Sequence, residues 1–201
     1  MRCRLFWSLA LVFHVIAVFP AVTAKAYAAP FSSSGEHQAM QRFRTRRDQQ
    51  NRIKAISAYF RQKNPRIPPQ KAAAYAQLIE EHTSRYNLDP FLAAAVLVKE
   101  STGKERAVSK GNYGLMQVNW TANRPWIVRT FPVRNTGELL VPENNILLGV
   151  HILSSGIGKS RGDIDGGLDR YRGRSLVSYR NEVHRHYRGI FRIFTELRKA
   201  S

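Results

Sequence analysis

Apolar residues recur at intervals of three and four positions through much of the chain, which is the spacing of one face of a helix. Asp163 can cap a short helix that ends near Tyr171. No stretch of any length alternates apolar and polar residues as a strand does. The chain is therefore predicted to be all-α, with further helices over the second half of 37–63 and over 69–86, 142–153 and 175–198.

The most apolar of the predicted helices lies near the middle of the chain. Asp89 can cap its free N–H groups, and Pro90 suits the first helical position. The segment 91–98 is almost wholly apolar, so the helix should be buried on most sides. Because burial penalises an ionised carboxylate, Glu100 at the helix end is a candidate general acid. The alternative is an ordinary solvated carboxylate.

Two segments lack helical spacing. Residues 119–140 are expected to be irregular, and 154–161 to form a glycine-containing loop. The first segment contains Trp120 and Trp126. Each ring is either buried in the core or exposed beside a cleft, where it could stack on a sugar.

The segment 1–28 has the organisation of a secretory signal peptide. A basic start precedes an apolar run over 5–22, and small residues follow. Cleavage is expected after Ala28, with Ala24 and Ala26 as nearby alternatives. Because the apolar run is long, an uncleaved membrane anchor is the competing interpretation. The expected location is the periplasm.

Charge and cysteine usage agree with export. The chain has 32 Lys and Arg residues against 14 Asp and Glu residues, a net charge of +18, which favours anionic partners. Its single cysteine, Cys3, lies within the signal peptide, so the exported chain would contain no disulfide. Export also argues against nucleic acid as the partner.

The segment 29–66 is expected to be a basic, partly helical extension. Residues 29–36 are small and polar and are expected to be disordered. The arginines that follow are either a solvated tail or a tether to the anionic cell-envelope surface. They are Arg42, Arg44, Arg46 and Arg47.

No metal and no cofactor are expected. The sequence contains no glycine-rich phosphate loop, no His-Glu-x-x-His motif and no paired cysteines. His184 and His186 are two residues apart on one helix, so they cannot share a metal well. The consecutive residues Glu80, Glu81 and His82 do not share a helix face, and we expect them to be exposed.

Several short motifs follow one another in a recognisable order. Glu100-Ser101 is followed by Ala107-Val108-Ser109, and Leu168-x-x-Tyr171 comes last. Between them lie Gly-Leu-Met-Gln-Val over 114–118 and Pro-x-x-Asn-Ile-x-x-Gly over 142–149. Over roughly 70–190 this order resembles the catalytic domain of the soluble lytic murein transglycosylases, which has the lysozyme-like fold of glycoside hydrolase family 23. The lysozyme-like domain is expected to span 67–201.

The resemblance implies a substrate, a reaction and a set of roles. The substrate would be the glycan strands of peptidoglycan, cleaved between N-acetylmuramic acid and N-acetylglucosamine without water to leave a 1,6-anhydro end. Glu100 would be the single catalytic acid and base. The substrate-binding residues would be Ser109 and Gln117 lining the cleft, Met116 in its apolar wall, Asn145 orienting the site and Tyr171 reaching into the cleft.

The chain departs from the family pattern at two places. Val141 stands where the family usually has Asp, and Arg172 stands where it has Asn after the tyrosine. Two other interpretations stay open, and the second change supports the latter of them. One is a lysozyme-like hydrolase on the same fold, with water as the nucleophile. The other is a catalytically weak, cationic wall-binding or scaffold protein.

Overall fold

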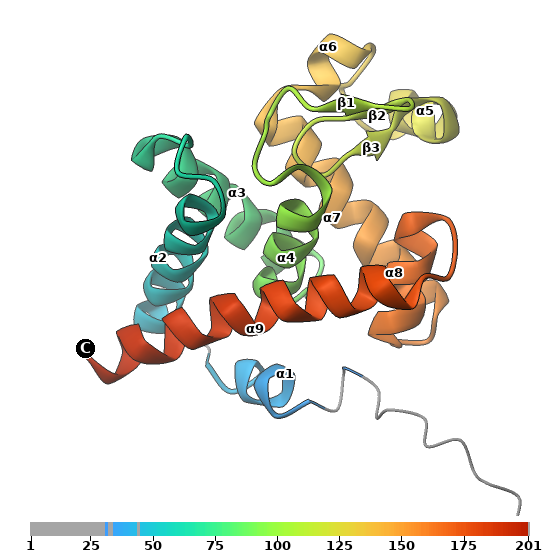
Figure 1. Cartoon of the computed structure of the whole chain (residues 1–201). Coiled ribbons are helices and arrows are strands. Elements are labelled where there is room, and N and C mark those ends of the chain that lie inside the picture. The colour runs from blue at the N-terminus through green and yellow to red at the C-terminus, as the bar shows by residue number, and fades with distance from the viewer. Residues whose placement is uncertain (1–30, 32–33, 44, 201) are drawn as a thin grey trace, which may run out of the picture.

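The structure is a computed structural model that describes residues 31, 34–43 and 45–200 (Figure 1). The predicted signal peptide and Arg44 lie outside the described residues. Within them, no helix is long and apolar enough to cross a membrane. The helices are α1 (Gly35–Met40), α2 (Arg46–Lys63), α3 (Pro69–Arg85), α4 (Pro90–Ser101), α5 (Trp120–Thr130), α6 (Thr136–Leu139), α7 (Pro142–Lys159), α8 (Ile164–Arg172) and α9 (Val177–Lys199). The strands are β1 (Val108–Ser109), β2 (Asn112–Tyr113) and β3 (Val118–Asn119).

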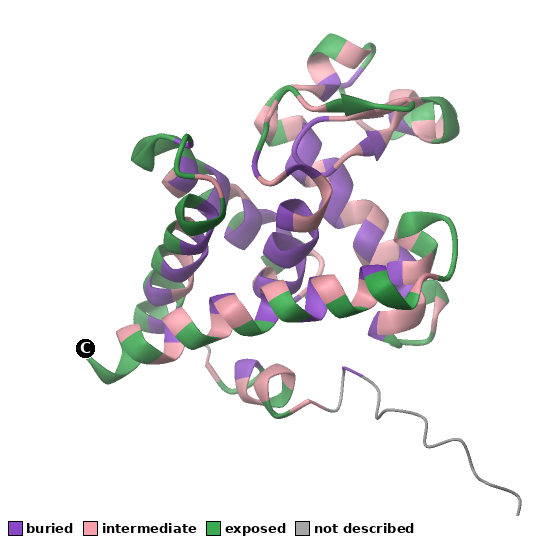
Figure 2. Ribbon diagram, viewed as in Figure 1, coloured by how far each residue is buried: buried purple, intermediate pink, exposed green. Residues whose placement is uncertain are grey.

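Helix α4 lies at the centre of the fold and packs against α2, α3 and α9 (Figures 1 and 2). Every residue of 91–98 is buried, as its apolar sequence predicts. Asp89 caps the helix, because its Oδ1 accepts a hydrogen bond from the Phe91 N–H at 2.9 Å. The predicted helical class is confirmed, and the only strands among the described residues form one small sheet.

Helix α2 belongs to the same core. Thr45 and Asp48 form a capping box at its start, which satisfies two backbone N–H groups reciprocally. Ile56 and Phe60, near the other end, are buried with the residues of α4. The expectation of disorder is wrong for the described part of 29–36, because α1 begins at Gly35 and the Phe31 ring stacks on His184 at 4.0 Å.

The three strands form an antiparallel sheet in the order β1-β2-β3 beside the end of α4. Its register pairs Val108 with Tyr113 and Asn112 with Asn119. A second, smaller apolar cluster lies beneath the sheet, α5 and α6. Its buried members are Val118, Ile127, Val133, Leu139 and Leu148.

The prediction of irregular structure over 119–140 is wrong. Helix α5 begins immediately after Asn119, whose Oδ1 accepts a hydrogen bond from the Ala122 N–H at 2.8 Å. Helix α6 follows, capped by Asn135. Periodicity did not indicate α5 because only Ile127 is buried along it and Pro125 lies inside it.

The loop predicted over 154–161 is also largely helical, because α7 continues to Lys159. Glycine lowers helix propensity, but here it permits close packing. A Cβ atom at Gly156 would lie 3.0 Å from the carbonyl oxygen of Gly167 on α8. The glycines therefore bring α7 and α8 together, and the helix is stabilised by this tertiary contact.

Two of the three adjacent residues on α3 are buried, contrary to the prediction. Glu80 forms an ion pair with Arg52 of α2, and His82 Nε2 lies 2.9 Å from Glu143 Oε1 of α7. Glu81 is exposed as expected. Helix α3 lies between α2 and α7, so polar groups on two of its sides find partners that are distant in the sequence.

Candidate active site

Glu100 lies in the last turn of α4 and faces a cleft of about 380 Å³. The helix ends at Thr102, which adopts a left-handed conformation with φ of 53° and turns the chain away. One side of the cleft comes from the sheet and the other from the start of α9 and the turn before it. The lining residues are Lys99, Glu100, Ser109, Lys110, Asn112, Gln117, Arg172, Leu176, Ser178, Tyr179 and Glu182.

A tyrosine on α9 holds the Glu100 carboxylate. The Tyr179 hydroxyl donates a hydrogen bond to Glu100 Oε1 at 2.6 Å, and Tyr179 is itself buried. Burial raises the pKa of Glu100, while the hydrogen bond from Tyr179 and the positive charges of Arg172 and Lys99 oppose the rise. The net direction is upward, so Glu100 keeps its proton to higher pH than an exposed glutamate.

A second carboxylate of the cleft has the opposite character. Glu182 forms an ion pair with Lys99, whose Nζ lies 2.5 Å from Glu182 Oε2. The hydrogen bond from Lys99 lowers the pKa of Glu182. At neutral pH this residue is ionised and already paired, whereas Glu100 is the carboxyl group that is suited to donate a proton.

The sheet side of the cleft is held by Gln117, which adopts a left-handed conformation with φ of 48°. Its Nε2 donates hydrogen bonds to the carbonyl oxygens of Ala107 and Gly114, both at 3.0 Å. These bonds connect the residue that precedes β1 to the segment between β2 and β3. Ser109 and Asn112 line the cleft from the turn between β1 and β2.

Asn145 fastens the sheet from behind and is fully buried on α7. Its Oδ1 accepts a hydrogen bond from the Met116 N–H at 2.7 Å, and its Nδ2 donates to the carbonyl oxygens of Tyr113 and Leu139 at 2.8 and 2.9 Å. A Cβ atom at Gly114 would lie 2.3 Å from Asn145 Nδ2, so this position requires glycine.

Two further residues lock the same region. The Tyr171 hydroxyl donates a hydrogen bond to the Met116 carbonyl oxygen at 2.6 Å. The Met116 side chain is fully buried, and a Cβ atom at Gly149 would lie 2.4 Å from its Sδ. Tyr171 and Met116 therefore fix the strip 114–118 from the side of α7 and α8.

The residues singled out in the sequence thus fall into two groups. Glu100, Ser109 and Gln117 line the cleft. Met116, Asn145 and Tyr171 are not among the lining residues and hold the sheet behind it. Sequence reasoning missed Tyr179, although it lies four residues before Val183 on the apolar face of α9 and so carried a helical signal.

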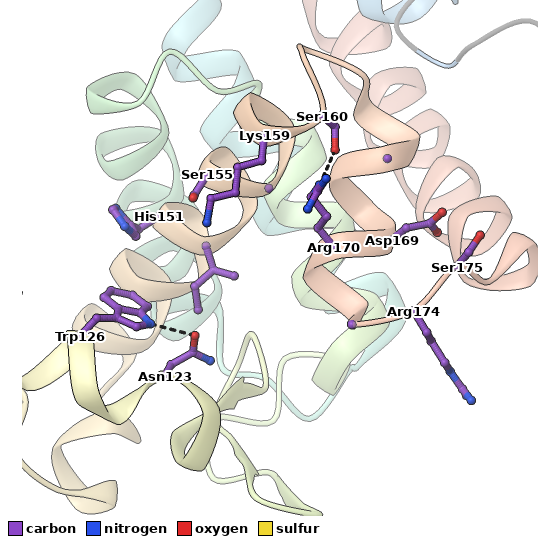
Figure 3. A pocket seen from close by; sticks show the side chains of 14 residues that line it. Asn123, Trp126, His151, Ser155, Lys159, Ser160, Asp169, Arg170, Arg174 and Ser175 are labelled. Carbon is purple, nitrogen blue, oxygen red and sulfur yellow. Dashed lines mark hydrogen bonds between the residues drawn. The ribbon is translucent and has the colours of Figure 1, made fainter.

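A larger cavity of about 890 Å³ lies between α5, α7 and α8 (Figure 3). Trp126 lines it, and both Trp120 and Trp126 are partly buried against the smaller apolar cluster. The sequence had left open whether each ring is buried or lies beside a cleft, and the two rings differ only in that Trp126 also lines this cavity. Among the described residues, no group of three or more His, Cys, Asp or Glu side chains is placed to hold a metal ion.

Fold and site together define a class: a small helical domain whose central helix ends in a carboxyl group of raised pKa, which faces a cleft beside a short sheet. The family model described as Transglycosylase SLT domain matches residues 77–186. The chain belongs to the transglycosylase SLT domain family.

Curated relatives agree with this assignment. The endo-type membrane-bound lytic murein transglycosylases A of Salmonella paratyphi B, Salmonella enteritidis and Salmonella typhimurium are each 34% identical to the chain over 95 residues. That match covers 45% of this chain and 47% of each relative. The chain therefore spans about half the length of these relatives. No solved structure matches it.

Proposed function

We propose that the chain is a lytic murein transglycosylase that cleaves the β-1,4 bond between N-acetylmuramic acid and N-acetylglucosamine in peptidoglycan. Its family and the names of its relatives support this reaction. The observation that carries the proposal is Glu100, a carboxyl group with a raised pKa, oriented by Tyr179 and open to the cleft. A raised pKa keeps a larger fraction of a carboxyl group protonated at a given pH, and the protonated form can donate to a leaving oxygen.

In the first step, Glu100 donates its proton to the glycosidic oxygen as the bond to C1 of N-acetylmuramic acid breaks. N-Acetylglucosamine leaves with that proton on its C4 hydroxyl. The positive charge at C1 is stabilised by the N-acetyl group of the same sugar. Tyr179 remains hydrogen-bonded to Glu100 and stabilises the carboxylate that has formed.

In the second step, the Glu100 carboxylate acts as a base. It takes the proton from the C6 hydroxyl of N-acetylmuramic acid while O6 forms a bond to C1. This closes the 1,6-anhydro ring, restores the protonated Glu100 and consumes no water. One carboxyl group thus serves first as the acid and then as the base. A pKa near the working pH suits both roles.

The main competing function is hydrolysis, in which a second carboxylate activates water or attacks the sugar. Glu182 is the carboxylate of the cleft that could take this part. Its ion pair with Lys99 favours a structural role instead. A scaffold protein without activity is the other alternative. The burial of Glu100 argues against it, because burying a carboxyl group costs stability and groups with such perturbed pKa values cluster at functional sites.

The mass of the sugar products tests the proposal. Digestion of purified sacculi should release products that are lighter by one water than those of a hydrolase. The Glu100→Gln variant should release very little, and Glu182→Gln should keep most of the activity. Products of full mass, together with equal losses in both variants, would establish two-carboxylate hydrolysis. Unchanged release by Glu100→Gln would overturn the enzymatic assignment.

We further propose that the chain acts in the periplasm and adheres to the anionic envelope through its basic surface. The exposed side chains of Arg42, Arg46 and Arg47 in the N-terminal part support this. Replacing all three with Gln should lower the amount of protein that sediments with sacculi, most strongly at low salt. Cell fractionation should recover the wild-type chain with the periplasm or envelope. Recovery with cytosolic nucleic acid would contradict this location.

A further inference from the structure

The larger cavity between α5, α7 and α8 is lined by both apolar and cationic side chains. Trp126 and His151 lie with ring centroids 5.2 Å apart, next to Ile152. Lys159 and Arg170 also line the cavity, from α7 and α8; the Lys159 side chain runs toward Ser155 and His151, and the Arg170 side chain toward Ser160 (Figure 3). An apolar surface beside fixed positive charge suits a ligand that carries both carboxylates and aliphatic groups.

The cavity is net positive. Asp169 is its only acidic lining residue, and Arg180 neutralises it, with Nη1 at 2.5 Å from Asp169 Oδ2. Asp169 Oδ1 also accepts a hydrogen bond from the Leu176 N–H. No ion pair of the described residues involves Lys159 or Arg170, and the Arg170 Nε donates a hydrogen bond to Ser160 Oγ at 3.0 Å. Their charges are available to an anionic ligand.

The cavity and the catalytic cleft share one turn. Arg172 and Leu176 line the cleft, while the residues between them, from Gly173 to Ser175, line the cavity. A ligand part that occupies the cavity would therefore lie across this turn from the sugars next to Glu100. The feature is independent of Glu100 itself, because none of the cavity residues contacts the catalytic carboxyl group in the hydrogen bonds of the described chain.

We propose that this cavity binds the acidic stem peptide that hangs from a muramic acid of the bound glycan strand. The peptide carboxylates would pair with Lys159 and Arg170, and its aliphatic part would lie against Trp126 and Ile152. The assignment rests on the proposed function for its substrate, and it adds peptide recognition to glycan cleavage. Ion pairs that are exposed to solvent contribute little binding free energy. The cavity would therefore help to select among glycan strands, but most of the affinity would come from other contacts.

A binding experiment tests the cavity without requiring turnover. The soluble stem peptide, freed from its glycan, is titrated into the Glu100→Gln protein while the indole N–H signal of Trp126 is followed by NMR. This N–H donates to Asn123 Oδ1 at 3.0 Å inside the cavity, so it reports occupancy directly. We expect a saturable shift, with Kd raised roughly three- to tenfold in Lys159→Gln/Arg170→Gln.

The matched control is Lys54→Gln/Arg61→Gln, which removes one lysine and one arginine charge from the exposed side of α2. It should leave the titration unchanged. Absence of a shift, or equal weakening in both double variants, would overturn the proposal. Because the titration uses an inactive protein, it stays informative even if the wild type proves to release no anhydro products.

A kinetic comparison separates the stem peptide from another carboxylate of the strand. Peptide-free strands expose the lactyl carboxylate of each muramic acid. We expect Lys159→Gln/Arg170→Gln to raise KM roughly three- to tenfold for peptide-bearing strands and less than about twofold for peptide-free strands. An equal rise on both substrates would show that the cavity takes the lactyl group, and would overturn the assignment to the peptide.

Discussion

Helix α4 carries a carboxyl group at each end, and both accept a hydrogen bond from a tyrosine of α9. At the start, Asp89 Oδ2 accepts from the Tyr187 hydroxyl at 2.5 Å. At the end, Glu100 Oε1 accepts from the Tyr179 hydroxyl at 2.6 Å. The two helices therefore run antiparallel, and the same side-chain pair occurs at both ends of their contact.

The surroundings of the two carboxyl groups differ. Asp89 also receives the Phe91 N–H and lies 3.2 Å from His37 Nδ1, at a helix N-terminus that favours negative charge. Glu100 has the Tyr179 hydroxyl as its hydrogen-bond donor among the described residues, lies at a helix C-terminus that disfavours negative charge, and faces a cleft. One pair caps a helix inside the fold, and the other faces the cleft with a carboxyl group whose pKa is raised.

The largest expected effect comes from a substitution at the Glu100 end of α4. Glu100→Gln should lower the rate of strand cleavage by about 10²- to 10⁴-fold, the usual contribution of general acid–base catalysis. Release of anhydro products from sacculi measures it. Glu105→Gln is the matched control, because Glu105 lies close by in the sequence but pairs with Lys71 outside the cleft.

The same variant also tests the pKa of Glu100. Because the folded-state pKa is raised above its ordinary value of 4.5, ionisation of Glu100 costs stability as the pH rises through the folded-state pKa. Glu100→Gln should therefore melt at a higher temperature than the wild type at pH 7. The difference should vanish at a pH below the ordinary value. A lower melting temperature at pH 7 would contradict the raised pKa.

The corresponding change at the other end should act on stability. Asp89→Ala removes a helix cap and leaves the buried Tyr187 hydroxyl without its acceptor. Together these losses should lower the free energy of unfolding by about 2–4 kcal/mol. Chemical denaturation measures it. The rate per folded molecule should stay within about twofold of the wild type at a temperature where both are folded.

The two tyrosines allow the sharpest paired test. Tyr179→Phe should lower the rate by about tenfold, because a hydrogen bond that orients the acid is lost. It should also move the alkaline limb of the pH–rate profile to higher pH, since this bond lowers the pKa of Glu100. Tyr187→Phe should destabilise the fold without moving that limb. Identical pH profiles for the two variants would refute the division of roles.

A smaller effect is expected where the chain departs from its family. Arg172→Asn removes a positive charge that lowers the pKa of Glu100. The pKa should rise, and the alkaline limb should shift to higher pH by less than in Tyr179→Phe, because the exposed charge of Arg172 is screened by solvent. The pH–rate profile at several salt concentrations measures this, with the shift shrinking as salt increases.

The smallest expected effect comes from a substitution that gives another helix a capping aspartate like Asp89. Helix α7 begins with Pro142 as α4 begins with Pro90, but its cap residue Val141 makes no side-chain hydrogen bond to the helix. Val141→Asp should raise the free energy of unfolding by about 1 kcal/mol. Thermal melting measures it, and Val141→Ala, which adds no acceptor, should give no such gain.

Local chemistry made part of this structure predictable. The caps at Asp89 and Asp163, and the burial of 91–98, follow from residues that are close in the sequence. The apolar helix before Glu100 made it a candidate acid but left a solvated carboxylate as the alternative, and the family resemblance supplied the expectation of a catalytic role. Met116, Asn145 and Tyr171 were recognised as important through the family pattern, but their position behind the cleft depends on tertiary packing.

The features that sequence reasoning missed depend on distant partners. Tyr179 contacts Glu100 across 79 positions, so no local pattern links them. Glu80 is buried because Arg52 of α2 pairs with it. The last turns of α7 form in spite of Gly156, because α8 packs on that glycine. In each case a tertiary contact outweighs the local tendency of the chain.

The attachment of the sheet to α7 also constrains how such a sequence can diverge. Gly114 leaves room for the Asn145 amide, and Gly149 leaves room for Met116. A change at one of these positions requires a compensating change at its partner. Two short motifs about 30 positions apart in the sequence thus form a single packing unit. The intervening segment is attached to the same unit, because Asn145 also donates a hydrogen bond to the Leu139 carbonyl oxygen and because Ile127 of α5 is buried in the smaller apolar cluster.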